Sequence, residues 1–93
     1  MSTEIQGSCD PQFASVQDAL SRNFAEHDEI GSAITVYHDG TKVVDLWGGH
    51  MDTQRSKPWR EDTLCIMYSI AKSMCATSVH ILADRGLVDL DAT

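Results

Sequence analysis

The residues with the clearest chemical potential are Ser69 and Lys72, which stand three positions apart in the stretch Tyr68-Ser69-Ile70-Ala71-Lys72-Ser73. Residues at this spacing on a helix lie on the same face, close enough to interact. A serine hydroxyl becomes a nucleophile when an adjacent base takes its proton, and an unprotonated lysine can be that base. The amides of the first helical turn would also favour a developing oxyanion. The pair therefore predicts acyl transfer through a covalent intermediate on Ser69.

The spacing alone is a weak signal, because nine serines and three lysines in 93 residues produce such a tetrad by chance about once in three or four chains. Its context favours chemistry. The apolar run from Leu64 to Tyr68 is expected to carry the chain into the interior, so that Ser69 lies at a strand-to-helix junction. The alternative is a serine that only caps the helix, with an unrelated lysine one turn later. The residues alone leave both interpretations open.

The element that must hold this pair is a helix, predicted from about Ser69 to Arg85 and closed by Gly86 in a left-handed C-cap. Its apolar residues occupy several sides, which predicts a helix covered by other elements on most of its surface. One side is formed by Ala71, Cys75, Val79 and Leu82, and other sides by Met74 and Ile81.

Upstream, residues 1–9 are predicted to be a flexible arm and residues 10–93 to form the domain. Asp10 is a plausible N-cap, and Pro11 suits the first position of a helix. The helix that follows carries one apolar stripe, at spacings of three and four residues. Its members are Phe13, Val16, Leu20 and Phe24.

Two β-rich runs follow, Ser32 to His38 and Thr41 to Gly48, separated by Asp39-Gly40. This dipeptide between two such runs is the strongest short signal for a hairpin. Apolar side chains are expected on both faces of the hairpin, as in a layered domain. The polar stretch from His50 to Thr63 is predicted to be a connecting loop, in which Trp59 is interpreted as an anchor rather than a lid.

Composition excludes several classes of function. A formal net charge of −7 with only seven basic residues argues against nucleic acid as a partner. No apolar stretch approaches the length of a membrane span, and the first dozen residues show no signal-peptide pattern. We therefore expect neither a nucleic-acid nor a membrane partner, and a cytoplasmic location.

The cysteines and histidines show no ligand spacing. Cys9, Cys65 and Cys75 are expected to be free thiols of a reducing compartment. The two near the motif are interpreted as packed thiols rather than nucleophiles. The four histidines are scattered and no phosphate-binding glycine loop is present. No metal and no cofactor are expected.

One amphipathic helix and one hairpin are too few elements to cover the predicted Ser69–Arg85 helix. An isolated hairpin is itself marginal in water. We therefore expect this chain to pack on further polypeptide.

Several segments together resemble the superfamily of serine β-lactamases and penicillin-binding proteins. The stretch from Tyr68 to Ser73, followed by Leu82-Ala83-Asp84-Arg85-Gly86-Leu87-Val88-Asp89-Leu90-Asp91, is similar to its first motif region. Three upstream segments are similar to its esterase branch, the class C β-lactamase-like carboxylesterases. They are Val36-Tyr37-His38-Asp39-Gly40, Val43-Val44-Asp45-Leu46-Trp47-Gly48-Gly49 and Pro58-Trp59-Arg60-Glu61-Asp62-Thr63-Leu64. The resemblance covers about residues 11–93.

The resemblance implies an α+β fold of the β-lactamase/transpeptidase type, an antiparallel sheet flanked by helices, present here as an incomplete N-terminal part. Ser69 would be the acylated nucleophile and Lys72 its general base, while the Ser69 amide and one amide from a later strand would form the oxyanion hole. Ala71 replaces the family's usual threonine. The family's catalytic tyrosine lies downstream of this chain, and Tyr37 and Tyr68 lie in the wrong segments to replace it.

The activity implied is that of a serine hydrolase, most simply a carboxylesterase acting on a small ester or amide. The rest of the domain would be its partner, as a second chain in the same particle or as the other part of a cleaved or truncated product. A β-lactamase or D-Ala peptidase is an alternative within the fold. A catalytically silent relative that serves as a binding or scaffold protein is the alternative from another class.

Overall fold

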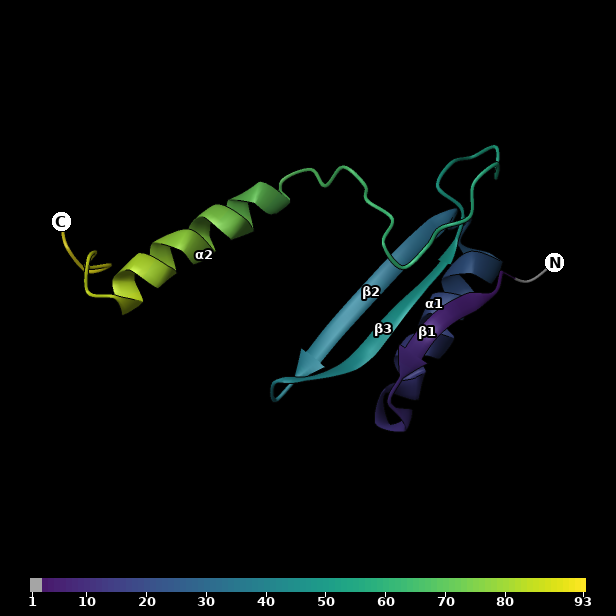
Figure 1. The fold of residues 1–93 in the computed structure, drawn as a ribbon, viewed down its shortest axis with the longest axis horizontal. Helices are drawn as coiled ribbons and strands as arrows, with labels where there is room; N and C mark the ends of the chain where they lie inside the picture. Colours follow the sequence, from purple (N-terminus) through teal and green to yellow (C-terminus); the bar gives the residue numbers. More distant parts are fainter. Residues whose placement is uncertain (1–2) are drawn as a thin grey trace. The chain divides into compact units, whose positions relative to one another are not determined.

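The computed structural model describes residues 3–93 (Figure 1). The chain divides into two compact units, one up to Thr63 and the other from Leu64 onward, and each is described by itself. The first unit contains a three-stranded antiparallel sheet in the order β1-β3-β2, a short 3₁₀ helix and one α-helix. Its elements are β1 (Ile5–Cys9), η1 (Pro11–Phe13), α1 (Ala14–Glu26), β2 (Gly31–His38) and β3 (Thr41–Gly49). The second unit contains α2 (Ile70–Asp84).

The predicted flexible arm is wrong from Ile5 onward. Ile5–Cys9 form β1, which pairs antiparallel with β3 from Ile5 opposite Gly48 to Cys9 opposite Val44. The strand continues into the helix start, because the amide of Asp10 donates to the carbonyl of Val43 at 2.8 Å. Met1 and Ser2, the beginning of that arm, lie outside the described residues.

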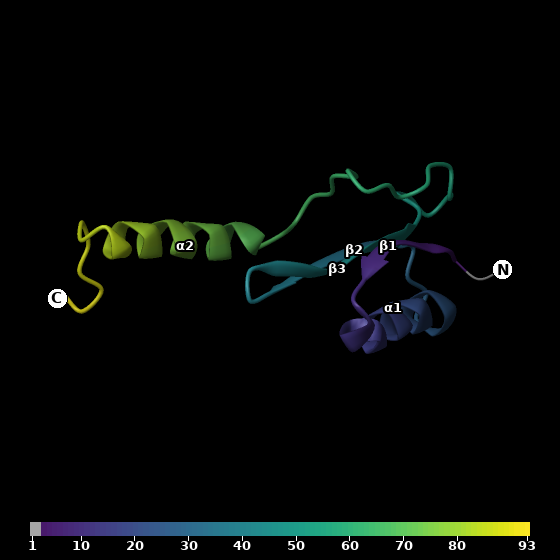
Figure 2. The same ribbon diagram turned by 60° about the horizontal axis from the view of Figure 1, so that its bottom comes forward.

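The predicted helix start is confirmed. The Asp10 carboxylate accepts a hydrogen bond from the amide of Gln12 at 2.9 Å, and Pro11 opens η1. The Asp10 carboxylate thereby satisfies the first-turn amide of Gln12, which would otherwise lack a partner. Pro11 has no N–H, so the first position of the helix leaves no donor unpaired. α1 follows directly and lies against one face of the sheet (Figure 2).

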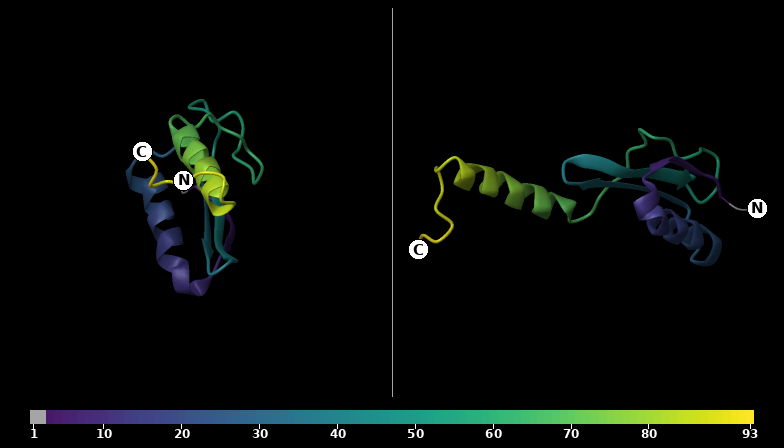
Figure 3. Two further views of the ribbon diagram at one scale, coloured as in Figure 1. Left: turned by 90° about the vertical axis from the view of Figure 1, so that its left-hand side faces the viewer. Right: turned by 90° about the horizontal axis from the view of Figure 1, so that it is seen from below.

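The core of the first unit lies between α1 and this face of the sheet. Leu20 of α1 and Val44 and Leu46 of β3 are buried, the last two with 0% and 2% of their surface exposed. Burying a side chain of the size of Leu46 contributes about 1.5–3 kcal/mol. The apolar stripe predicted on α1 is confirmed, since Phe13, Val16 and Phe24 pack around this centre. Figure 3 shows the same helix-on-sheet layer from below.

The predicted hairpin is confirmed, with each strand one residue longer than expected. Asp39 and Gly40 both have positive φ (50° and 76°), as the two-residue turn that suits the strand twist requires. Ile34 stands opposite Leu46 and Val36 opposite Val44 on the α1 side. The opposite face also carries apolar side chains, as predicted: Ala33 stands opposite Trp47, next to the polar pair Thr35 and Asp45.

The predicted loop after β3 folds back on the end of the sheet. His50 forms an antiparallel bridge with Pro58, and the amide of Trp59 donates to the carbonyl of Gly49 at 2.9 Å. Trp59 is half-buried and packs over Gly31, where an added Cβ would meet its ring at 2.7 Å. The interpretation of Trp59 as an anchor is confirmed.

The tip of this loop is held by Asp52, whose carboxylate accepts hydrogen bonds from the amide and hydroxyl of Ser56 at 3.0 and 2.5 Å. These two bonds lower the pKa of Asp52 below its ordinary value of 3.8. The lowered pKa means that this turn stabilises the fold above the ordinary pKa. The contribution is lost as the pH falls through the lower, folded-state pKa.

We expect Ser56→Ala to raise the pKa of Asp52 toward its ordinary value, because the bond from the hydroxyl is the larger cause of the shift. A carboxyl-carbon NMR titration of the chain between about pH 2 and 6 measures this pKa directly. Asp62, an exposed carboxyl of the same segment, serves as the internal control. An Asp52 titration curve that does not move on this substitution would contradict the assignment.

The second unit is built around α2, whose bounds confirm the predicted helix. Its C-terminus is also as expected: Gly86 has φ 74°, its amide donates to Ala83 at 3.0 Å, and the amide of Leu87 donates to Leu82 at 2.9 Å. This pair of bonds is a Schellman cap, in which glycine adopts the left-handed conformation without strain.

The expectation that Leu64 to Tyr68 runs into the interior is wrong for this chain. The segment is irregular rather than a strand, and Leu64 and Tyr68 are 90% and 86% exposed. α2 contains no buried residue, although most of its side chains are apolar. The second unit supplies one α-helix and no strand among its residues, so it has no element of its own that could cover α2.

Candidate active site

Ser69 is the N-cap residue of α2 and has an unusual backbone conformation. Its φ and ψ are 64° and −3°, in the left-handed region that residues with a Cβ rarely adopt. A serine in this position commonly caps the helix with its hydroxyl, but the Ser69 side chain makes no capping hydrogen bond. Backbone strain of this kind costs about 1–3 kcal/mol and is concentrated at functional sites. Because it makes no capping bond, the Ser69 hydroxyl is available for another interaction.

Lys72 lies one turn further along α2, and its amide donates to the carbonyl of Ser69 at 3.2 Å. This bond closes the turn that separates the two residues and keeps them on neighbouring positions of the helix surface. Both side chains are exposed, and within residues 3–93 neither takes part in a side-chain hydrogen bond or ion pair. The structure thus brings the two predicted site residues onto one helical turn without a direct bond between their side chains.

The main chain at Ser69 also presents a donor. Within the described residues its amide has no hydrogen-bond partner, and it lies at the positive end of α2. A free amide beside a free hydroxyl is the local arrangement that acyl transfer needs, because the amide can stabilise the oxyanion produced by attack of the hydroxyl.

The two cysteines near the motif are not packed as expected. Cys65 and Cys75 are both exposed free thiols, whereas Cys9 is partly buried, with its thiol 3.3 Å from the carbonyl oxygen of Phe13. The exposed thiols belong to the same apolar, uncovered surface as the rest of the second unit. The described residues contain no group of three or more His, Cys, Asp or Glu side chains that could hold a metal ion.

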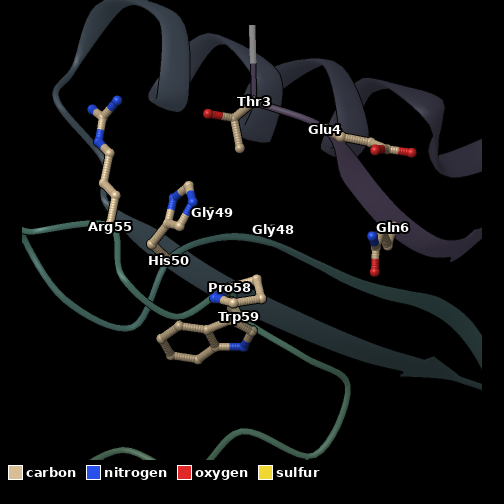
Figure 4. Close-up of a pocket in the computed structure, with 9 residues that line it drawn as sticks. All are labelled: Thr3, Glu4, Gln6, Gly48, Gly49, His50, Arg55, Pro58 and Trp59. Atoms are coloured by element: carbon tan, nitrogen blue, oxygen red, sulfur yellow. The ribbon is translucent and has the colours of Figure 1, made fainter.

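A pocket of about 300 Å³ lies in the first unit, at the end of the sheet where the loop after β3 folds back (Figure 4). Arg55, Pro58 and Trp59 of the loop form one wall, and Glu4 and Gln6 another. The sequence analysis missed this pocket, since it treated residues 50–63 as a connecting loop and residues 1–9, which include Glu4, as a flexible arm. The pocket contains neither Ser69 nor Lys72.

Neither α1 nor α2 combines the length and apolar character that a membrane crossing requires, and the rest of residues 3–93 contains no other α-helix. An antiparallel sheet with a helix on one face, followed along the chain by a helix that begins after Ser69, agrees with the β-lactamase-like fold that the sequence resembles.

The comparisons with known proteins agree with this class. Residues 16–93 match the Beta-lactamase family model, and the chain belongs to this family. It is 43% identical over 88 residues to Esterase/beta-lactamase LipL of Mycobacterium tuberculosis (strain ATCC 25618 / H37Rv). It also superposes on the crystal structure of a family VIII carboxylesterase with a TM-score of 0.90 and 50% identity.

These comparisons cover nearly all of this chain but a small part of each relative. The alignment with LipL spans 95% of this chain and 20% of LipL, and the carboxylesterase match spans 96% of this chain and 24% of that chain. The resemblance noted in the sequence is thus confirmed, and the fold is that of a fragment of the β-lactamase fold.

Proposed function

We propose that this chain carries the nucleophile and the general base of a serine hydrolase that cleaves small carboxylic esters. In this proposal Ser69 is acylated, Lys72 accepts its proton, and polypeptide outside this chain supplies the rest of the site. The names of the two relatives, an esterase/β-lactamase and a carboxylesterase, support the ester class.

The observation that carries the proposal is the conformation of Ser69. Its left-handed backbone frees the hydroxyl from capping and leaves the amide unpaired at the positive end of α2. A serine that only capped the helix would use its hydroxyl for that bond. Lys72 on the same turn is the nearest group along α2 that can act as a base once unprotonated.

The reaction would proceed in two halves. The Ser69 Oγ attacks the ester carbonyl carbon while its proton passes to Lys72 Nζ, and the Ser69 amide stabilises the oxyanion. The tetrahedral intermediate collapses to the acyl-enzyme as the alcohol leaves with the proton from Lys72. Water then attacks the acyl carbon with Lys72 again as base, which releases the acid and restores Ser69.

The incomplete site explains why both side chains are exposed. The chain spans 20% and 24% of its two relatives, and α2 is apolar but uncovered. The remaining C-terminal part of the hydrolase domain, as a second chain or another piece of the same protein, would complete the oxyanion hole and line the substrate pocket. We propose that the reaction needs no cofactor and that the protein binds neither nucleic acid nor a membrane. We propose the cytoplasm as its compartment.

A second candidate is a catalytically silent β-lactamase-fold protein that binds or scaffolds, and a third is a β-lactamase or D-Ala peptidase. The unused Ser69 hydroxyl favours an enzyme over a silent relative. The carboxylesterase relative favours an ester over a β-lactam or peptide substrate.

A fluorophosphonate probe tests the proposal, because it phosphonylates only an activated serine. The chain is mixed with the remainder of the family VIII carboxylesterase, expressed without the segment that this chain matches, and the adduct is located by peptide mass. We expect the adduct on the peptide that contains Ser69, and none on the 93-residue chain alone. An assembled particle that is never labelled supports the silent relative. Efficient hydrolysis of a nitrophenyl ester by the chain alone would contradict an incomplete site.

A further inference from the structure

The pocket at the end of the sheet lies within the first unit, and the ester hydrolysis proposed above does not use it. It has a volume of about 300 Å³ and contains neither Ser69 nor Lys72. A volume of this size is at the lower end of those that hold small molecules in proteins. The chemistry of its walls indicates which kind of molecule it suits.

One part of the pocket is apolar and fixed in place. Trp59 is half-buried, its amide donates to the carbonyl of Gly49 at 2.9 Å, and Pro58 forms a bridge with His50. Gly48 and Gly49 line the pocket without side chains, so a ligand can approach the main chain there. An anchored indole ring beside two such residues suits a planar apolar group.

The other part of the pocket carries hydrogen-bond donors and a permanent positive charge. Figure 4 shows the Arg55 guanidinium, the His50 ring and the Thr3 hydroxyl toward the same end of the pocket. Within residues 3–93 the Arg55 guanidinium has no acidic partner in an ion pair. A guanidinium presents its N–H groups in a fork that matches a carboxylate, and imidazole and hydroxyl groups add further donors. This end therefore suits an anionic group with acceptor oxygens.

The balance of charge in the pocket favours a ligand with a single negative charge. Among the described residues that line it, Arg55 is the one permanent cation and Glu4 the one carboxylate. In Figure 4 the Glu4 carboxylate points toward the opposite end from Arg55. One guanidinium matches one carboxylate in charge and geometry, whereas a doubly charged phosphate would keep an unpaired negative charge in a pocket that already holds Glu4.

We propose that this pocket binds a small carboxylate with a planar apolar body, of which benzoate is the simplest example. The carboxylate lies against Arg55, His50 and Thr3, and the ring lies beside Trp59. The site includes neither residue of the proposed catalytic pair, so binding does not depend on ester hydrolysis. The acids that hydrolysis of aromatic esters releases belong to this chemical class, so the reaction proposed above would produce ligands for the pocket.

An amide NMR titration of the 93-residue chain with sodium benzoate at constant ionic strength tests the proposal. We expect saturable shifts of the Trp59 indole N–H and of the Trp59 and Gly49 amides, with a Kd on the order of 1 mM. Benzyl alcohol has the same ring without the charge, and inorganic phosphate has the charge without the ring. Each should bind about tenfold more weakly than benzoate or worse. Shifts that do not saturate, or an equal affinity for either of these probes, would overturn the proposal.

A pair of arginine variants separates the site from a general attraction of charge. Arg55→Gln removes the positive charge but keeps the loop, because the Arg55 amide, and not its side chain, donates to Asp52 at 3.1 Å. We expect it to weaken benzoate binding about tenfold or more. Arg60→Gln is the matched control, since Arg60 is an exposed arginine of the same segment that does not line the pocket. It should change the Kd by less than about twofold, and equal effects of the two substitutions would overturn the site.

Glu4→Gln distinguishes a carboxylate ligand from a positively charged one. For a carboxylate, removal of this exposed negative charge should leave the affinity unchanged or raise it by up to about threefold. An ammonium ligand such as benzylamine would instead use Glu4 and the ring face of Trp59, and the substitution would weaken its binding. Benzylamine that binds more tightly than benzoate, with an affinity that falls in Glu4→Gln, would overturn the proposal.

The titration is repeated on the chain assembled with the remainder of the family VIII carboxylesterase, as described above. Binding that depends on Arg55 should persist there, and its loss would overturn the proposal because the added polypeptide would then fill the pocket. The result is distinguishable from that of the catalytic proposal. Benzoate binding with no probe label on Ser69 supports the pocket and contradicts the enzyme, and a labelled Ser69 without benzoate binding has the opposite meaning.

Discussion

Replacing Ser69 with alanine is expected to remove ester hydrolysis by the assembled particle almost completely. The substitution deletes the oxygen that would form the acyl-enzyme. No other hydroxyl of the described residues lies at the N-cap of α2 to replace it. Removal of a nucleophile lowers kcat by on the order of 10⁴–10⁶-fold in serine hydrolases. The measurement is turnover of a nitrophenyl ester by the chain assembled with the remainder of the family VIII carboxylesterase.

The matched control is Ser73→Ala, because Ser73 is an exposed serine of the same helix, four residues further along. It should keep full turnover and full probe labelling. If the assembly still forms, misfolding does not explain a loss of turnover in Ser69→Ala. Removing this hydroxyl breaks no hydrogen bond of the described residues. Turnover of Ser69→Ala equal to that of the parent assembly would exclude Ser69 as the nucleophile.

Replacing Lys72 with glutamine is expected to lower kcat by about 10²–10⁴-fold, the usual contribution of a positioned general base. Glutamine keeps much of the stem and a polar end but cannot accept the serine proton. KM should change little, because a base acts on the transition state rather than on substrate binding. The rate of fluorophosphonate labelling at Ser69 should fall in parallel with kcat, since both reactions need the activated oxygen.

The control for this lysine is Lys57→Gln in the exposed loop after β3. It removes the same charge from the chain and should leave kcat and the labelling rate unchanged. A Lys72→Gln assembly that is labelled at the parental rate would show that Lys72 is not the base. That result would support the alternative interpretation, in which Ser69 is followed one turn later by an unrelated lysine.

Both predictions concern a proposed site, and the helix that carries its two residues is formed within this chain. The turn from Ser69 to Lys72 is closed by its own backbone bond, and the Schellman cap at Gly86 ends α2 without help from other elements. What α2 lacks is cover for its apolar side chains, all of which are at least partly exposed. We infer that the partner that covers α2 would also exclude water from Ser69, which strengthens the electrostatic contribution of the free amide.

The sequence by itself determined the features that depend on near neighbours along the chain. Asp10 caps the first helix, Asp39-Gly40 turns the hairpin, and Gly86 closes α2, because each uses only bonds within a few residues. The apolar stripe of α1 was equally readable, since its spacing follows the helical period. The Ser69–Lys72 spacing belongs to the same group.

Only the tertiary structure decided the features that join distant segments. Ile5–Cys9 is polar and contains a glycine, so its own residues give little sign of a strand, and pairing with β3 some forty residues later makes it one. The same holds for the pocket at the end of the sheet, because its walls come from the beginning of the chain and from the loop after β3. The left-handed conformation of Ser69 is also visible only in the folded backbone. The structure, and not the sequence, shows that the Ser69 hydroxyl does not cap the helix.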